Sequence, residues 1–160
     1  MGDKTTVDLD VPALHKSVVS KFLIPFLFPT VNTTPMDHGV IRFTIDEVNY
    51  GDLPFLEELQ KLGIAFHQYW ESGSEYTAGE RSLRFTEEGV AIHRSFFQSD
   101  IADQVEDALA KYDPQLSDQE LGAQFRLLCE SIKAQTETLP WDYQVEYGKL
   151  YRTRQLIDPS

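Results

Sequence analysis

The sequence predicts an α+β fold, with a three- to four-stranded, mainly antiparallel sheet over about residues 39–97. Two observations predict the sheet. Residues 40–46 alternate between apolar and polar side chains, as a half-buried strand does. Turn segments at 72–79 and 87–89 then separate further alternating stretches. A third observation adds helices, because apolar residues in the C-terminal half recur with the helical period.

The chain starts with a polar stretch, and we expect residues 1–9 to be flexible. Asp10 and Pro12 are typical of the cap and first turn of an N-terminal helix. Its apolar face recurs every four residues, at Leu14, Val18 and Phe22. The apolar run 22–28, interrupted by Pro25, is either a strap buried across the core or an exposed patch for dimerisation or partner docking.

The central unit should run strand, short crossover helix, strand. Residues 39–46 form the first strand, with Ile41, Phe43 and Ile45 on its buried side. Asp52 is placed to cap the helix, and Gly63 to end it in the left-handed conformation. The chain then returns as a strand at 64–70, followed by a hairpin and by further strands at 81–86 and 90–97.

The last part of the chain should be helical. We expect one helix from Asp100 to about Tyr112 and a second opened by the capping box of Ser117 and Glu120. The second helix has a predicted buried seam, formed by Leu121, Phe125, Leu128 and Ile132. The two helices should form a hairpin packed on the sheet or beside it. Residues 140–160 are ambiguous, and we expect a short helix and then an extended tail, flexible over 152–160. No linker divides the chain, so we expect a single domain.

Composition narrows the function classes. With 26 acidic and 14 basic residues the formal net charge is −12, which disfavours direct binding of nucleic acid or of anionic lipids. No apolar segment is long enough to span a membrane, and no signal peptide is recognisable. A single cysteine, Cys129, permits no internal disulfide, so we expect a cytoplasmic protein.

No catalytic or metal-binding motif is present. The histidines are isolated, the HExxH and CxxC spacings are absent, and no glycine-rich loop precedes a helix. We therefore expect no cofactor, no metal and no catalytic residue. The best alternative ligand site is formed by His67 and His93, which approach each other if both strands turn them to one face, together with Arg84.

Two stretches stand out as candidate partner-binding surfaces. The hairpin after the second strand mixes aromatic and acidic residues, as recognition surfaces do: Tyr69, Trp70, Glu71, Glu75 and Tyr76. The second stretch is an acidic face opposed by Lys111 alone: Asp100, Asp103, Glu106, Asp107, Asp113, Asp118 and Glu120. Each also has a plainer interpretation, as a packed hairpin and as a solvated helix face.

Three functions remain open. The first is a non-catalytic acidic module that binds a basic protein partner, as an inhibitor of a nucleic-acid-handling protein by nucleic-acid mimicry. Acidic anti-restriction and anti-CRISPR proteins are similar in size and composition, although no motif identifies a family. The second is a small enzyme or ligand-binding domain at His67 and His93. The third is a structural or assembly subunit, including a homodimer.

Overall fold

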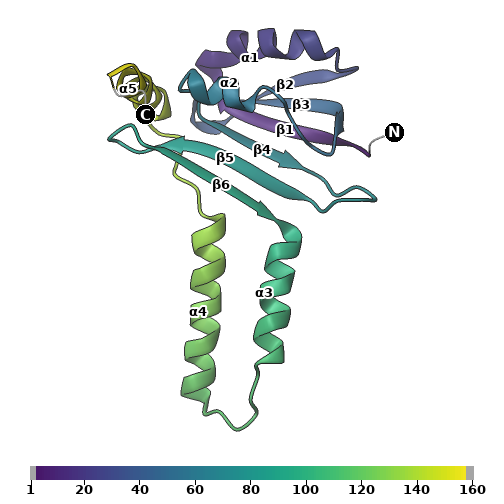
Figure 1. Cartoon of the computed structure of the whole chain (residues 1–160), viewed down its shortest axis with the longest axis vertical. Coiled ribbons are helices and arrows are strands. Elements are labelled where there is room, and N and C mark those ends of the chain that lie inside the picture. Colours follow the sequence, from purple (N-terminus) through teal and green to yellow (C-terminus); the bar gives the residue numbers. More distant parts are fainter. Residues whose placement is uncertain (1–2, 158–160) are drawn as a thin grey trace.

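The computed structural model describes residues 3–157 and shows a six-stranded antiparallel sheet with five α-helices (Figure 1). The strands are β1 (Lys4–Pro12), β2 (Val31–Met36), β3 (Val40–Asn49), β4 (Phe66–Trp70), β5 (Gly79–Phe85) and β6 (Ala91–Phe97). The helices are α1 (Lys16–Leu23), α2 (Leu56–Lys61), α3 (Gln98–Ala110), α4 (Asp118–Thr136) and α5 (Gln144–Ile157). The α+β class is confirmed, but the predicted three or four strands are too few.

The first four strands and two helices form one recognisable unit. The sheet order is β2-β3-β1-β4-β5-β6, so the βαββαβ segment from β1 to β4 has the strand order of a ferredoxin-like fold. Strands β5 and β6 extend the sheet beyond β4. Helices α1 and α2 cover one face of the sheet, and we call the opposite face the open face (Figure 1).

Strands β1 and β2 were not predicted. Lys4–Pro12 is strand β1, where flexible residues and a helix cap were expected; Met1 and Gly2 lie outside the described residues. Val7, Leu9 and Val11 alternate with two aspartates, which is the sequence pattern of a half-buried strand. This pattern begins within the residues that were expected to be flexible. Strand β2 is an exposed edge strand, so its residues show no alternation between apolar and polar side chains. It also contains Pro35, which has no backbone N–H to donate to the neighbouring strand.

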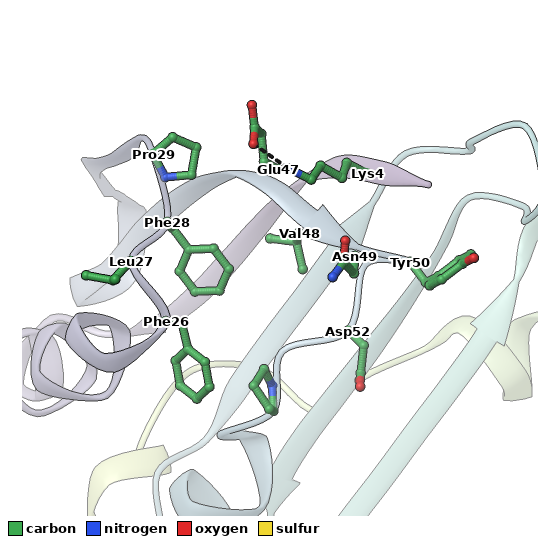
Figure 2. A pocket seen from close by; sticks show the side chains of 11 residues that line it. Lys4, Phe26, Leu27, Phe28, Pro29, Glu47, Val48, Asn49, Tyr50 and Asp52 are labelled. Carbon is green, nitrogen blue, oxygen red and sulfur yellow. Dashed lines mark hydrogen bonds and ion pairs between the residues drawn. The ribbon is translucent and has the colours of Figure 1, made fainter. Parts of the chain in front are cut away.

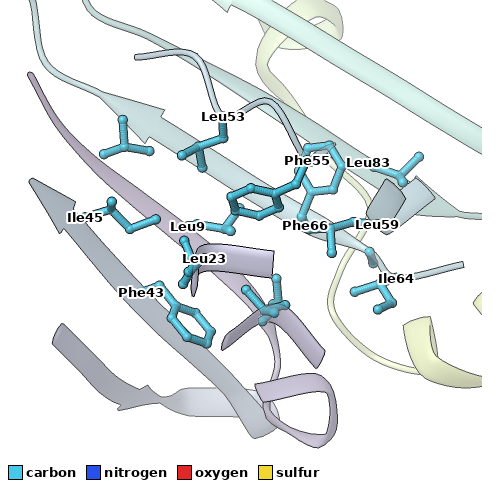
Figure 3. Close-up of a cluster of buried hydrophobic side chains, with 14 of the residues drawn as sticks. Leu9, Leu23, Phe43, Ile45, Leu53, Phe55, Leu59, Ile64, Phe66 and Leu83 are labelled. Atoms are coloured by element: carbon cyan, nitrogen blue, oxygen red, sulfur yellow. The ribbon is translucent and has the colours of Figure 1, made fainter. Parts of the chain in front are cut away.

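The core lies between the sheet and its two helices. Leu9, Phe43 and Ile45 of the strands form one buried cluster with Leu23 of α1, with Phe55 just before α2 and with Leu59 of α2 (Figure 3). The strand positions alternate with polar residues that face the other way, so the two-residue period separates a dry face from a polar one. The 22–28 run is buried only in part, because Leu23 is buried whereas Ile24 and Leu27 are exposed.

Helix α5 lies against one end of the sheet. Gly63 has the expected left-handed φ of +63°, and a Cβ there would collide with the backbone oxygen of Gly148 in α5. The side-chain amide of Gln144 accepts a hydrogen bond from the Phe85 backbone N–H at 2.7 Å and donates one to its carbonyl at 3.0 Å. The predicted extended tail is therefore wrong as far as Ile157, and residues 158–160 lie outside the described part.

Two further local predictions change. Asp52 does not cap α2, whose N-cap is Phe55 without a side-chain hydrogen bond; the Asp52 carboxylate instead lies 3.1 Å from Arg81 Nη1. Helices α3 and α4 do form an antiparallel hairpin, but it does not pack on the sheet. It projects from the β6 end of the body, with contacts to the sheet only near its base (Figure 1).

Candidate interaction site

The projecting hairpin, residues 98–136, is called the arm below. Helix α3 follows β6 directly, and its start is fixed by the Asp100 carboxylate, which accepts a hydrogen bond from the Phe97 backbone N–H at 2.9 Å. Helix α4 begins with the predicted capping box, in which Ser117 N–H donates to Glu120 Oε2 at 2.9 Å. Its 19 residues make it about 28 Å long at 1.5 Å per residue.

The contact between the two helices is narrow and partly polar. Near the base, the Gln104 side chain is hydrogen bonded to Gln135 at 2.8 Å and to Ser131 at 3.2 Å. Half-buried apolar residues continue the seam, with Ile101 on the base side of Gln104 and with Ala108, Leu121 and Leu128 toward the tip. No residue of α3 or α4 is buried. The arm therefore has no core of its own.

Acidic residues dominate the arm. It carries eight Asp and Glu side chains and three Lys and Arg side chains, which leaves −5 of the chain's net charge of −12. Three of the seven predicted acidic residues serve local structure: Asp100 and Glu120 as caps, and Asp113 by accepting from the Gln115 backbone N–H at 2.9 Å. The hydrogen bonds from Ser117 also lower the pKa of Glu120.

The other four predicted acidic residues are exposed, and in the described part of the chain they form no hydrogen bond or ion pair: Asp103, Glu106, Asp107 and Asp118. Large apolar side chains are exposed beside them. Leu109 is 69% exposed, Phe125 68% and Leu127 67%. Phe125 was predicted to be buried in the seam. It is exposed because a two-helix hairpin has no third element to cover it.

The β4–β5 hairpin separates the residues predicted to form its binding surface. Trp70 is buried on the helix-covered face, where its indole Nε1 donates to the Thr77 carbonyl at 3.0 Å. Tyr69 points to the open face instead. Tyr76 packs edge-on against Tyr50 with ring centroids 5.8 Å apart, and the Tyr50 hydroxyl donates to Glu75 at 3.1 Å. Of the five, only Glu71 and Glu75 are exposed.

The alternative ligand site is also divided. Strand register places His67 opposite Ser82, and His93 opposite Leu83. Neighbouring residues of a strand face opposite sides, so His67 lies on the open face with Arg84, whereas His93 lies on the other face. The structure thus brings His67 and Arg84 together and leaves His93 apart.

The open face carries a polar network that the sequence analysis did not find. Arg42 contacts two aspartates of β1: its Nε lies 2.7 Å from Asp10 Oδ1, and its Nη1 lies 3.3 Å from Asp8 Oδ2. The hydrogen bonds that Arg42 donates to the Asp10 carboxylate raise the pKa of Arg42. The Arg42 guanidinium also lies 5.5 Å from the centre of the Tyr69 ring. The alternation of aspartates along β1 was the available signal.

His67 lies at the centre of this network and is neutral. Its Nδ1 is 3.0 Å from the Tyr69 hydroxyl, and its ring stacks on that of Tyr69. Its Nε2 lies 3.2 Å from Glu80 Oε2, but out of line for a hydrogen bond. Burial lowers the pKa of His67 to about 3 and raises the pKa of Tyr69 to about 12. Neither group changes its protonation near neutral pH, as a general acid or base would.

Arg84 is held in place by protein groups. Burial lowers its pKa to about 10. Its Nη1 donates to the Phe66 carbonyl at 2.6 Å and its Nε to the Leu139 carbonyl at 3.1 Å, while Trp141 stacks over the guanidinium at 3.5 Å. These contacts fix the segment after α4 onto the sheet. Among residues 3–157, no cluster of three or more His, Cys, Asp or Glu side chains is suited to hold a metal.

A depression of about 620 Å³ lies between β3 and the 26–29 segment (Figure 2). Its apolar wall includes Phe26 and Phe28, and its rim carries the ion pair between Lys4 and Glu47, at 2.6 Å. Three residues that line this depression, Leu27, Glu47 and Tyr50, have a left-handed backbone, with φ of +50°, +60° and +51°. The opening is wide, and the two titratable groups that meet at it, Lys4 and Glu47, are about half exposed to solvent rather than enclosed with a substrate as in a catalytic site.

No protein-family model matches the chain, and neither the curated proteins nor the solved structures include a significant match. Among the described helices, none combines the length and apolar character needed to cross a membrane.

Proposed function

We propose that this protein is a non-catalytic binding module that attaches to the basic surface of a protein partner through its acidic arm. The observation that carries the proposal is the arm itself, a helical hairpin that projects from the body and carries exposed carboxylates without internal partners. Carboxylates neutralised by a lysine or arginine of the same chain would have little charge to offer a partner. Those of Asp103, Asp107 and Asp118 are free to meet cationic groups.

The carboxylates are arranged in a row. Asp100, Asp103 and Asp107 are spaced three and four residues apart on α3, so they share one side of that helix. A step of four residues covers about 6 Å of helix axis. Phosphates on one DNA strand are spaced about 3.4 Å apart along the axis. The charges in this row are thus spaced more widely than the phosphates of a DNA strand. A groove lined with lysine and arginine would attract both the row and the DNA.

Because one basic groove would attract both the arm and DNA, the proposal extends to the kind of partner and to the effect of binding. The partner is a basic nucleic-acid-handling protein, and the arm inhibits it by occupying its nucleic-acid groove, in the manner of an anti-restriction or anti-CRISPR protein. The competing hypothesis of a ligand site at His67 and His93 has less support, because the sheet lies between the two side chains.

The proposal is tested by capture of partners from a native lysate on the immobilised full chain. The bait is compared with a variant carrying Asp103→Asn, Asp107→Asn and Asp118→Asn. The control variant Asp37→Asn, Glu57→Gln and Glu146→Gln removes the same number of exposed carboxylates from the body. We expect a basic protein on the wild-type and control baits only, released by high salt and displaced by duplex DNA.

Equal capture by the arm variant would contradict the role of the arm. Capture that depends on the arm but resists duplex DNA would contradict nucleic-acid mimicry and leave a protein-binding module.

A further inference from the structure

The arm has an apolar stripe separate from its acidic row. From the half-buried seam residue Ile101, Val105 and Leu109 lie about 40° and 80° around α3, at about 100° per residue. From Leu121, Phe125 and Cys129 lie at the same angles around α4. Antiparallel helices turn in opposite senses when viewed from one end, so both sets point to the same side of the arm. Val105, Leu109, Phe125 and Cys129 are all exposed.

The stripe is continuous along the arm. Contacts of Gln104 with Ser131 and Gln135 set the relative height of the two helices. With that register, Val105 lies level with Ile132, Leu109 with Leu128, and Tyr112 with Phe125. Leu127, equally exposed, lies about 120° the other way around α4 and faces the opposite side. One side of the arm is therefore apolar from Val105 and Ile132 to Tyr112 and Phe125, as a helix pair is when it forms half of a four-helix bundle, and Asp118 lies beyond this stretch at the tip.

We propose that a second copy of this chain covers the stripe, so that two arms form a four-helix bundle. The charged residues on the two edges of the stripe favour a second copy of the chain at this position. Glu106 lies on the α3 edge, and Arg126 and Lys133 lie on the α4 edge. A two-fold axis along the arms places each α3 against the α4 of the other copy, so Glu106 meets Lys133 at nearly the same height. Within residues 3–157, Lys133 is paired only with exposed Glu137, at 3.9 Å.

The same charges exclude the alternative symmetry. If the arms pointed in opposite directions, α3 would pack on α3 and α4 on α4, and like charges would meet along both edges. At 0.15 M salt the Debye length is about 8 Å, so these near pairs count more than the repulsion between distant carboxylates. The two arms should therefore point the same way, with their bodies at the same end of the bundle.

The apolar contact is tested by sedimentation equilibrium of the full chain at 0.15 M salt under reducing conditions. We expect a concentration-dependent dimer. Leu109→Asp should weaken the dimer at least about tenfold, because it puts a charge in the contact. The matched control Leu127→Asp places the same charge at an equally exposed site on the other side and should leave the dimer constant unchanged. Circular dichroism confirms that both variants are folded.

The arrangement is tested by exchanging charges. Glu106→Lys and Lys133→Glu should each weaken the dimer, and the double variant should restore it. A monomer at every concentration, or equal effects of Leu109→Asp and Leu127→Asp, would overturn the proposal. Tighter association of Lys133→Glu would overturn the parallel arrangement, since it would show that like charges meet there.

Self-association and partner binding are separable. The triple aspartate variant used for partner capture changes no apolar residue of the stripe and leaves Glu106 intact. Of its three sites only Asp118, at the start of α4, lies on the stripe side, about 60° around the helix from Leu121, and its neutralisation adds no charge to the contact, so the variant should dimerise at least as tightly as the wild type. Loss of its dimer would count against the separate apolar stripe and would leave the capture experiment valid.

Discussion

Gln144→Ala should destabilise the protein more than any surface truncation. The Gln144 side chain is only 3% exposed, and both ends of its amide are hydrogen bonded to the Phe85 backbone, at 2.7 and 3.0 Å. Its removal leaves a buried N–H and a buried carbonyl without partners. Each unsatisfied group costs about 1–3 kcal/mol, so the free energy of unfolding should fall by about 2–6 kcal/mol. For this chain length, Tm should fall by about 5–15 °C.

The measurement is urea unfolding followed by tryptophan fluorescence, with an unchanged m value as evidence that the same transition is compared. Gln155→Ala is the matched control, because it truncates an exposed glutamine in the same helix and should change stability by less than about 0.5 kcal/mol. A loss below about 1 kcal/mol for Gln144→Ala would refute the reasoning, since water would then be replacing both hydrogen bonds.

Gln144→Glu gives an internal check on the direction of the two bonds. A glutamate retains the acceptor for the Phe85 N–H but, when ionised, has no donor for the Phe85 carbonyl. Its pKa in the folded variant should be raised, so the stability deficit should shrink as pH falls toward 5 and grow as pH rises. A deficit independent of pH would show that the donated bond contributes nothing.

Three further changes should have measurable effects. The folded pKa of His67 is about 3, below its ordinary value of 6.5, so the unfolded chain binds a proton that the folded one does not, and stability falls as pH falls below 6.5. His67→Gln should remove up to about 1.4 kcal/mol of this loss per pH unit between pH 6.5 and 5, measured by urea unfolding; equal pH slopes would contradict the burial of a neutral imidazole. Gly122→Ala should stabilise the arm by about 0.5–1 kcal/mol, because a Cβ there meets open space. A lower Tm of this variant in thermal unfolding would show a close contact instead. Trp141→Ala should destabilise the protein by about 3 kcal/mol in urea unfolding, because it removes the ring stacked on Arg84, and a change below about 1 kcal/mol would show that the stacking is dispensable.

The fold could be predicted where one period dominates a segment. Strand β3, the turn at Gly89 and the capping box at Ser117 follow local rules that tertiary packing did not alter. Strand β1 was missed because its polar side pairs with Arg42, a partner 32 residues away, so its aspartates resemble a solvated terminus in sequence. Edge strand β2 has no buried residue and thus no apolar period to detect.

The arm could be predicted only in part. Its helical periods and its charge are visible in the sequence, but an apolar stripe has the same pattern whether it packs on a sheet, on a neighbouring helix or on another molecule. The fold decides among these, because β6 ends at the edge of the sheet and directs α3 away from the body (Figure 1). Phe125 was therefore placed in a buried seam and is exposed.

The role of the arm in partner binding is tested most directly by the dissociation constant of the purified partner for three forms of the chain. These are the wild type, the variant with Asp103, Asp107 and Asp118 changed to asparagine, and the variant with three body carboxylates neutralised. We expect the arm variant to bind at least about tenfold more weakly and with a shallower salt dependence, and the body variant to match the wild type. Equal affinity of all three forms would contradict the account.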